Sequence, residues 1–435
     1  MDLNPEEFLL RLFDTAVEAA SPHQVLARHL PNDKSARTIV IGAGKAAASM
    51  AAALEEAWQG ELSGLVVTPY GHTETCKKIE VIEAAHPVPD NAGEIVAKRI
   101  MALADGLTAE DQVICLISGG GSALLSLPAP GINLKEKQGI NRALLKSGAT
   151  IIEINCVRKH LSAIKGGRLA LACSPAQVHT YAISDVPGDD AQVIASGLTV
   201  ADDSTSAQAL DILHQYEIEV PDNVLKWLNS AESETPKSDH PAFANTTFTM
   251  IATPQQSLDA AAECARNADI PVMILSDCIE GESREVAKVH AAIARQVAKY
   301  GQPLQAPCVI LSGGETTVTV KGNGRGGRNA EFLLSFFNSL KGQANIYALA
   351  TDTDGIDGSE DNAGAMITPE TWLRAKRLGL ESSEFLDNND GYSFFLATDS
   401  LIATGPTRTI QLSLATHSFR VARRMSRTVF SALDF

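Results

Sequence analysis

Short runs of β-branched and aliphatic residues recur along the chain, and most are followed by a glycine turn and an alanine-rich or polar stretch. Examples are RTIVIGAGKAAASMAAALEEA at 37–57, DQVICLISGGGSALLSL at 111–127, APCVILSGGETTVTV at 306–320 and ANIYALATDTDGIDG at 344–358. Strand-like runs that alternate with helical stretches predict a parallel sheet with crossover helices. In such sheets the loops at the carboxyl ends of the strands carry function. The pattern therefore predicts an α/β fold whose glycine clusters mark ligand-binding loops.

The length of the chain predicts two domains. Single cores stop growing at roughly 250 to 300 residues, and this chain has 435. The segment 228–245 is polar, contains two prolines and has no apolar period, so it is the best candidate for a linker. We expect a Rossmann-like parallel sheet with flanking helices over 1–235 and a second α/β domain over 246–435.

The composition narrows the class of protein. Hydrophobic residues make up 45% of the chain and charged residues 20%, as in ordinary soluble globular proteins. The net charge of −16 argues against nucleic-acid binding, which needs a basic face. The seven cysteines form no CxxC pair, which indicates reduced thiols, no structural zinc and a cytoplasmic location. No window approaches the roughly 18 apolar residues of a membrane span, so we expect no membrane partner.

The first glycine turn, GAGKAA, matches the dinucleotide fingerprint at Gly42, Gly44 and Ala47. A nicotinamide enzyme also needs an acidic residue at the end of the second strand, for the ribose hydroxyls. Here that strand ends in Thr-Pro-Tyr at 68–70, so this interpretation loses its main support. The phosphate-loop pattern GxxxxGK[ST] is not met either. Lys45 then has two interpretations: a phosphate-binding lysine, or a solvated lysine at a helix start.

The second glycine turn, SGGGS at 118–122, ends a strand that is expected to be buried. Consecutive glycines can point several backbone N–H groups at one anion, so this turn is a candidate nest for a phosphate or a carboxylate. A serine hydrolase elbow is disfavoured, because G-x-S-x-G needs a glycine where Leu124 stands. A tight turn without a ligand is the alternative.

Basic residues gather in VRKHLSAIKGGRLA at 157–170, which we expect to form a helix. Helical spacing would place Arg158, Lys165 and Arg168 near one face, next to Lys159 and His160 in the sequence. In so acidic a chain this stripe is a candidate anion-binding face. A solvated helix surface is the alternative.

Two acidic loops offer oxygen ligands. ISDVPGDD at 183–190 supplies Asp185, Asp189 and Asp190 around a Pro-Gly turn, and carboxylates of this kind suit Mg²⁺. Turn chemistry alone also explains aspartate beside Pro-Gly. The loop TDTDGIDGSEDNAGA at 351–365 lacks the closing glutamate of an EF-hand, since Ala363 stands there. We expect it to be an oxygen-rich loop that caps a strand.

The stretch LSGGETTVTVKGNGRGGRNAEF at 311–332 combines glycines with Arg325, Arg328 and Glu331. Arginine binds phosphate or carboxylate with two parallel hydrogen bonds, and glycine removes steric obstruction beside it. A hairpin rich in turn glycines would explain the glycines but not the charged residues. We therefore predict an anion site here.

Taken in order, GAGKAA, SGGGSALL, VRKHLSAIKGGRLA, SDVPGDD, SGGETTVTV, GRGGRNAEF, TDGIDG and NAGA resemble the glycerate 2-kinases of the MOFRL family, from about residue 5 to 407. The resemblance implies two α/β domains with the active site in the cleft between them. It implies transfer from ATP, with Mg²⁺, to glycerate, giving 2-phosphoglycerate. It also leaves a homodimer open. Because relatives are sometimes labelled hydroxypyruvate reductase, an NAD(P)H-dependent reductase is one alternative, and a non-catalytic sugar-acid or nucleotide sensor is another.

The resemblance also implies the residues of the site. For catalysis it indicates Lys45 and Arg328, with Arg325 as a supporting charge. Mg²⁺ would be held by Asp189 and Asp354. The substrate and the nucleotide would be bound by Gly44, Ser118, Gly119, Gly120, Gly121, Ser122, Arg158, Lys159, Gly313, Gly314, Glu315, Asn329 and Glu331.

The terminus departs from the family pattern after Thr407. Residues 408–435 contain five arginines, no lysine and one aspartate, in a chain whose net charge is −16. We interpret 408–435 as a divergent or frameshifted segment.

Overall fold

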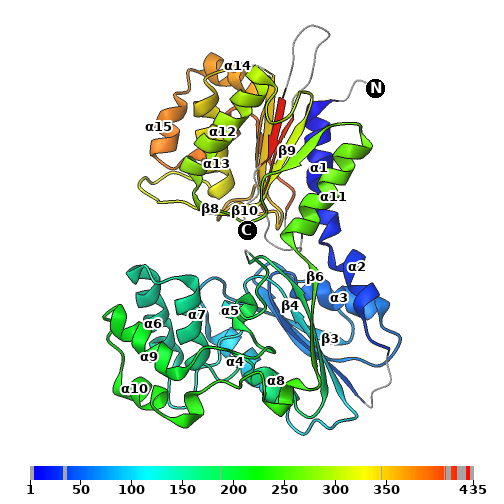
Figure 1. Cartoon of the computed structure of the whole chain (residues 1–435), viewed down its shortest axis with the longest axis vertical. Coiled ribbons are helices and arrows are strands. Elements are labelled where there is room, and N and C mark those ends of the chain that lie inside the picture. The colour runs from blue at the N-terminus through cyan, green and yellow to red at the C-terminus, as the bar shows by residue number, and fades with distance from the viewer. Residues whose placement is uncertain are drawn as a thin grey trace. The chain divides into compact units, whose positions relative to one another are not determined.

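The computed structural model describes residues 4–32, 37–186, 188–343, 345–405, 407, 413–418 and 428–431 (Figure 1). The chain forms two compact units, an N-terminal unit, Pro22–Ile251, and a C-terminal unit, which combines Met1–Ser21 with Ala252–Phe435. This division differs from the predicted ranges 1–235 and 246–435. Helix α1 (Pro5–Ala19) joins the C-terminal unit because its buried face, including Phe8 and Phe13, packs into that unit's core.

Among the described residues, six strands form the sheet of the N-terminal unit, in the order β3-β2-β1-β4-β5-β6. The pairs from β3 to β5 are parallel, which confirms the predicted Rossmann-like sheet. Its strands are β1 (Thr38–Ala43), β2 (Ser63–Pro69), β3 (Ile79–Ala84), β4 (Gln112–Ile117), β5 (Gln177–Ile183) and β6 (Thr246–Ala252). Its helices are α2 (Pro22–Val25), α3 (Ala47–Ala57), α4 (Asn91–Leu103), α5 (Gly121–Leu124), α6 (Leu134–Ser147), α7 (Ile151–His160), α8 (Arg168–Cys173), α9 (Ser206–Gln215) and α10 (Asp222–Leu228).

The two central strands of this sheet, β1 and β4, are buried along their whole length, as their unbroken apolar runs predict. They run side by side with Ala43 opposite Ile117. Their carboxyl ends therefore release the two glycine turns at neighbouring points of one sheet edge. A second core lies among α6, α7, α9 and α10.

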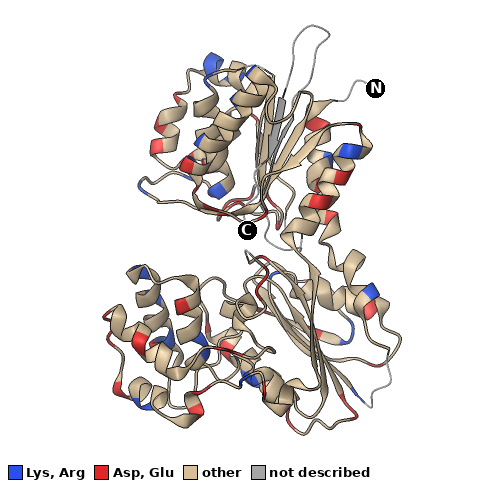
Figure 2. Ribbon diagram, viewed as in Figure 1, with Lys and Arg blue, Asp and Glu red and all other residues tan. Residues whose placement is uncertain are grey.

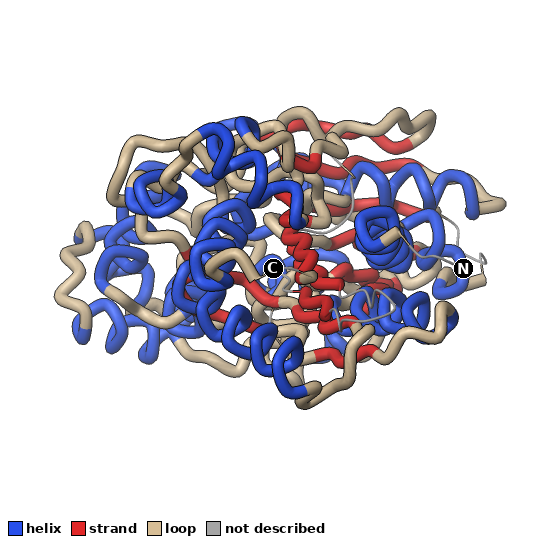
Figure 3. Tube along the Cα trace, turned by 90° about the horizontal axis from the view of Figure 1, so that it is seen from above, coloured by secondary structure: helices blue, strands red, loops and turns tan. Residues whose placement is uncertain are grey.

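The C-terminal unit is also a layered α/β fold, with helices on both sides of its sheet (Figures 1 and 3). The sheet order is β13-β12-β11-β15-β14-β9-β7, and β10 pairs separately with β8. The strands are β7 (Val272–Ile274), β8 (Ile279–Glu282), β9 (Val309–Ser312), β10 (Gly314–Thr317), β11 (Ile346–Asp352), β12 (Gly364–Ile367), β13 (Leu401–Ile402), β14 (Ser413–Ser418) and β15 (Thr428–Ser431). The helices, besides α1, are α11 (Pro254–Asn267), α12 (Ser283–Tyr300), α13 (Arg328–Leu340), α14 (Pro369–Leu378), α15 (Ser382–Asp387) and α16 (Gly391–Ala397).

The segment 228–245, which we expected to be a linker, packs on the N-terminal unit. It forms two short 3-10 helices, Ala231–Ser233 and Pro241–Phe243. The Arg168 guanidinium donates to the carbonyls of Glu232, Ser233 and Glu234 at 2.8 to 3.2 Å. A polar segment without an apolar period is thus fixed through its backbone.

The prediction of one helix through 157–170 is wrong. Helix α7 ends at His160, and α8 begins at Arg168. Gly166 and Gly167 between them have φ of 59° and 81°, in the left-handed region. The alternative of a solvated surface is wrong as well, because Lys159, His160, Lys165 and Arg168 are at most 9% exposed.

Strands β14 and β15 come from the segment 408–435, which we interpreted as divergent. Both pair with β11 in the sheet of the C-terminal unit. The remaining residues of that segment lie outside the described part of the chain. Of the described helices, none is long and apolar enough to cross a membrane.

Candidate functional site

The two glycine turns of the N-terminal unit are joined by backbone hydrogen bonds. The Lys45 N–H donates to the Gly119 carbonyl at 2.8 Å, and the Ser118 N–H donates to the Ala43 carbonyl at 3.1 Å. The Ser118 hydroxyl accepts from the Ala46 N–H at 3.0 Å. The turns after β1 and β4 are therefore one structure, which fixes the backbone of Lys45.

Glycine is required at two positions of this structure because other groups approach so closely. A Cβ atom on Gly44, whose φ is +143°, would lie 2.1 Å from the Ser118 hydroxyl oxygen. A Cβ atom on Gly119 would lie 1.8 Å from Oδ2 of Asp185. The glycines thus let a carboxylate from the loop after β5 reach the turn after β4.

Lys45 and His86 lie beside Gly120, the middle glycine of the second turn. A Cβ atom on Gly120 would be 3.1 Å from the His86 Nε2 and 3.6 Å from the Lys45 Cγ. Lys45 is 8% exposed. The Lys45 side chain, the His86 imidazole and the Asp185 carboxylate therefore lie beside one glycine turn. The sequence interpretation missed His86, and its only signal was its position just after the third strand.

Ser122 lies one turn further on, at the start of α5. Its hydroxyl is 2.7 Å from the Ser196 hydroxyl. The Lys165 amine donates to the Ser122 carbonyl at 2.7 Å and lies 3.3 Å from the Ser122 hydroxyl. Of the predicted binding residues nearby, Lys159 forms a buried ion pair with Asp202 at 3.0 Å. Arg158 is half-buried, and its Nε donates to the Asn141 side chain at 2.6 Å.

Arg328 begins helix α13 in the C-terminal unit and contacts two carboxylates. Its Nη1 donates to Glu315 at 2.5 Å, and its Nη2 donates to Asp352 at 3.3 Å. Asp352 is fully buried at the end of β11, whereas Glu315 is half exposed on β10. The Arg328 guanidinium thus lies at the edge of the sheet where β11 ends. The Arg328 side chain is 17% exposed.

The amino-terminal end of α13 is capped from the acidic loop. The Asp357 carboxylate accepts from the Asn329 N–H at 3.0 Å and from the Ala330 N–H at 2.9 Å. A Cβ atom on Gly327 would lie 2.2 Å from the Asp357 Oδ1, which explains that glycine. A carboxylate at this position is favourable for the helix dipole. Two N–H groups at the start of α13 are therefore bonded to a carboxylate within the protein.

Arg325 and Glu331 have partners of their own. Arg325 donates to Glu360, with its Nε at 3.0 Å, and stacks over the Tyr392 ring at 4.2 Å. Glu331 is 2% exposed, accepts from Arg284 Nε at 2.8 Å and receives a second bond from the same guanidinium. Burial raises the pKa of Glu331, and the Arg284 contact partly offsets this effect. Arg325, Arg328 and Glu331 therefore have separate partners in the structure, and sequence reasoning missed Arg284.

Gly313 and Gly314 are packed against the chain that enters β8. The Gly313 N–H donates to the Ser276 carbonyl at 2.7 Å. A Cβ atom on Gly314 would lie 1.9 Å from the Ile279 carbonyl oxygen. Glu315 then follows on β10, next to Arg328. The predicted hairpin alternative is not what forms, because β10 pairs in parallel with β8.

The acidic loop after β11 is an oxygen-rich cap, as expected. Figure 2 shows acidic segments in the loops at this end of the sheet. Asp354 is 2% exposed, and its Oδ1 accepts from the Ile356 N–H at 2.9 Å. Asp189, with φ of 53°, is half-buried in the loop after β5 of the other unit. Within the described ranges no group of three or more His, Cys, Asp and Glu side chains could hold a metal ion, so the pairing of Asp189 with Asp354 stays a prediction.

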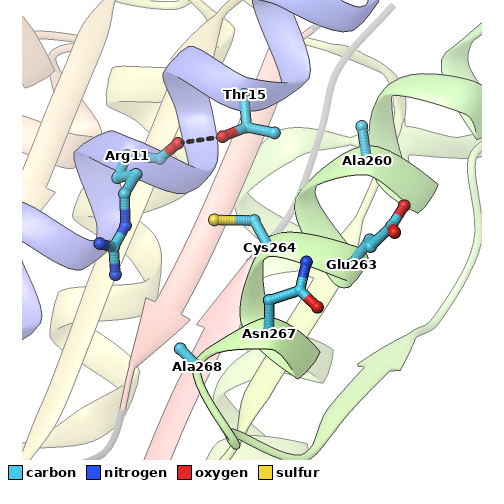
Figure 4. Close-up of a pocket in the computed structure, with 7 residues that line it drawn as sticks. All are labelled: Arg11, Thr15, Ala260, Glu263, Cys264, Asn267 and Ala268. Carbon is cyan, nitrogen blue, oxygen red and sulfur yellow. Dashed lines mark hydrogen bonds between the residues drawn. The ribbon is translucent and has the colours of Figure 1, made fainter.

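A pocket of about 430 Å³ lies apart from these residues, between α1 and α11 (Figure 4). Helices α1 and α11 cover the face of the sheet opposite α12 and α13 (Figure 1). In the pocket wall the Thr15 hydroxyl donates to the Arg11 carbonyl at 2.8 Å. The lining residues are Arg11, Thr15, Ala260, Glu263, Cys264, Asn267 and Ala268. They present no convergent set of groups, so the candidate site remains at the strand ends.

Comparison with known proteins gives two family matches. Residues 8–229 match a domain of unknown function, DUF4147, and residues 308–410 match the MOFRL family. The chain is 47% identical over 411 residues to an Agrobacterium vitis protein whose provisional name is hydroxypyruvate reductase, covering 94% of this chain and 93% of that one. It is 39% identical to the D-glycerate 2-kinase of Thermotoga maritima, covering 93% of this chain and 96% of that one. The crystal structure of the Thermotoga maritima glycerate kinase matches with a TM-score of 0.87 and 38% identity, covering 95% of this chain and 99% of that one.

Proposed function

This chain belongs to the MOFRL family, and from that premise we propose that it is an ATP-dependent glycerate 2-kinase. It transfers the terminal phosphoryl group of ATP to the 2-hydroxyl group of glycerate and yields 2-phosphoglycerate. The observation that carries the proposal is the bond between Lys45 N and Gly119 O at 2.8 Å, which joins the lysine turn to the glycine turn. A lysine beside a run of glycine backbone is the arrangement that suits phosphate groups.

Phosphoryl transfer depends mainly on positioning and on neutralising charge at the moving group. In this proposal Lys45 and Arg328 neutralise that charge. They belong to different units, so their action on one nucleotide, in a cleft between the domains, is part of the proposal. Arg325 has a supporting role, because its bonds to Glu360 and its contact with Tyr392 hold the loop that leads to Arg328.

Mg²⁺ accompanies the nucleotide in this proposal and neutralises phosphate charge when it is bound. An ion that binds with a nucleotide takes only one or two protein carboxylates. Asp354 supplies a buried carboxylate two residues after Asp352. The proposal assigns Asp189 as the second carboxylate. These residue types fit the ion, since all of them offer hard oxygen ligands.

The rival reductase is disfavoured by Thr68, at the end of β2. This residue is fully buried, and its hydroxyl lies 3.4 Å from the Lys45 carbonyl and 3.5 Å from the His72 carbonyl. A nicotinamide enzyme would present a carboxylate here to the ribose hydroxyls. The position serves instead to hold the lysine turn.

A set of parallel assays tests the proposal. With ATP, Mg²⁺ and D-glycerate we expect ADP release that depends on all three, and a phosphorus NMR spectrum of the product that identifies the 2-phosphate ester. Oxidation of NADH or NADPH with hydroxypyruvate, without ADP release, would support the reductase. Binding of glycerate and ATP without turnover would support the sensor.

A further inference from the structure

Lys165 lies beside Ser122, at the end of the second glycine turn, and Lys137 and Arg158 are close enough to Lys165 to act on its charge. Lys137 is on α6, Arg158 is on α7, and Lys165 is in the turn that follows α7; the basic segments on α6 and α7 are visible in Figure 2. We propose that this basic group binds the carboxylate of the hydroxy-acid acceptor. The inference rests on the proposed kinase function and adds a binding site to it.

The two lysines of the basic group are buried, Arg158 is half-buried, and none of the three has an acidic partner among the described residues. Lys165 is 1% exposed and Lys137 is 7% exposed. In the part of the chain that the structure describes, no carboxylate oxygen lies within 4.0 Å of any of the three side chains. Their hydrogen bonds go to neutral oxygens, such as the Ser122 carbonyl for Lys165. Buried lysines are nearly always paired, so an anionic ligand is the partner that would keep these side chains charged.

A neighbour in the same segment shows the contrast. Lys159, which directly follows Arg158 in the sequence, is paired with Asp202 at 3.0 Å. Glu94 acts on Lys137 only from a longer distance, and it already pairs with Lys98 at 2.6 Å. Among the described residues, the fold therefore supplies an acid where a lysine has a structural role and none within contact of the basic group.

The charges of the group act on one another. Burial, with the charges of Lys137 and Arg158, holds the pKa of Lys165 well below its usual range. Burial, with the charges of Arg158 and Arg168, lowers the pKa of Lys137 to about 7. A bound carboxylate would favour the charged forms of both amines. Burying the two amines thus costs free energy when the site is empty, and a bound anion would reduce that cost.

Ser196 fixes the position of Ser122, beside which the Lys165 amine lies. Its hydroxyl is 2.7 Å from the Ser122 hydroxyl and donates to the Asn155 side chain at 3.2 Å. Ser196 and Ala195 have φ of 60° and 49°, which is unfavourable for residues other than glycine. Such backbone strain clusters at ligand sites, where it orients a side chain. The strained turn therefore supports a binding role for this neighbourhood.

A carboxylate suits the basic group better than a polyphosphate does. The two amines are almost fully enclosed, so the group that meets them has to be small. The phosphates of ATP are assigned to Lys45, Arg328 and Mg²⁺ in the proposed function. The alternative is that a phosphate group binds at the basic group. The experiment below distinguishes a bound carboxylate from a bound phosphate.

The test compares Lys165→Met and Lys137→Met with a control, Lys135→Met, an exposed position on the same helix as Lys137. We expect both test variants to raise the KM for D-glycerate at least tenfold and to leave the KM for ATP within twofold, while the control changes neither. A change in the KM for ATP instead would move the nucleotide to this site and overturn the inference. Unchanged values for both substrates would overturn it as well.

A binding measurement on the unmodified protein needs neither turnover nor a variant. Calorimetric titration should show binding of D-glycerate and no binding of glycerol, in which a hydroxymethyl group replaces the carboxylate. Equal binding of the two, or none of glycerate, would overturn the inference even if ADP release proves the kinase. If the protein binds glycerate, with weakened binding in Lys137→Met, yet transfers no phosphate, the proposed function fails and the carboxylate site stands.

Discussion

Arg328 donates to Asp352 at 3.3 Å and so joins the first residue of α13 to the last residue of β11. Asp352 is fully buried, whereas the Arg328 side chain is 17% exposed. The buried Asp352 carboxylate therefore orients the Arg328 guanidinium and leaves part of it accessible to solvent. Arg328 and Asp352 can be substituted separately. The effect of Arg328 on turnover can therefore be measured apart from the effect of the pair on stability.

Arg328→Ala should lower kcat of the proposed kinase by roughly 100-fold or more, since one donor to developing charge is worth that much in other enzymes. It should also destabilise the protein, because the buried Asp352 carboxylate loses its bond to the guanidinium. Adding Asp352→Asn should restore stability without restoring turnover. Steady-state kinetics and urea unfolding check both parts. Turnover near that of the unmodified protein in a folded Arg328→Ala variant would contradict the assigned role.

The sequence predicted the parallel sheet and its two glycine turns because the signal for each is local. Alternating strand and helix patterns fix the fold class, and in GAGK and SGGG the glycines adjoin the strand that positions them. It did not predict that 228–245 packs on the N-terminal unit. There Arg168 binds backbone carbonyls. Because every residue has a backbone carbonyl, the side chains of this segment give no signal of the contact.

The partners of the charged residues also could not be predicted from the sequence. Arg284 lies 47 residues before Glu331 and pairs with it only because α12 and α13 pack together. Asp357 lies 28 residues after Asn329, whose N–H it caps at the start of α13. The predicted helix through 157–170 failed because Gly166 and Gly167 adopt left-handed conformations, whereas the charge spacing alone suggested a continuous stripe.

Gly44→Ala should disrupt the joined glycine turns. The added Cβ atom would lie 2.6 Å from the Ser118 carbonyl oxygen, and φ of +143° is unfavourable for alanine. We expect a loss of about 2 kcal/mol or more in the free energy of unfolding, together with loss of turnover. Urea unfolding and the ADP-release assay measure the two effects.

Gly139→Ala is the matched control for that change. Gly139 lies in the exposed middle of α6, and nothing lies within 4 Å of its added Cβ atom. Alanine should stabilise the helix by about 0.5 to 1 kcal/mol and leave turnover unchanged. A stable and active Gly44→Ala variant would show that the turns do not need this close approach.

Arg284→Met should lower the free energy of unfolding by about 3 to 5 kcal/mol, because it leaves the Glu331 carboxylate buried without the Arg284 guanidinium. The Glu331 side chain is 3% exposed in the pair. The double variant Arg284→Met with Glu331→Leu should lose much less free energy of unfolding than the two single variants lose together. Lys288→Met on the same helix is the control, because its pair with Glu285 is exposed on both sides and should be worth under about 1 kcal/mol. Additive single costs in urea unfolding would contradict the pairing.

Lys137→Met should stabilise the protein more at pH 6 than at pH 9. The pKa of Lys137 is lowered to about 7 by burial and by the charges of Arg158 and Arg168, against which Glu94 acts weakly. Between that value and the ordinary lysine pKa, the unfolded chain binds a proton that the folded chain does not, so stability rises with pH there. Below pH 7 the folded protein has to charge a buried amine, and the penalty is fully present.

The advantage of Lys137→Met over the unmodified protein should therefore shrink by about 2 to 3 kcal/mol from pH 6 to pH 9, at about 1.4 kcal/mol per pH unit. Urea unfolding in a buffer free of oxyanions measures this difference, because a bound anion would raise the pKa of the amine. The exposed Lys135→Met variant should show no such trend. A difference between Lys137→Met and the unmodified protein that is constant with pH would mean that this amine keeps an ordinary pKa in the folded protein. The charge that we assign to the basic group beside Ser122 would then be compensated by groups other than a ligand.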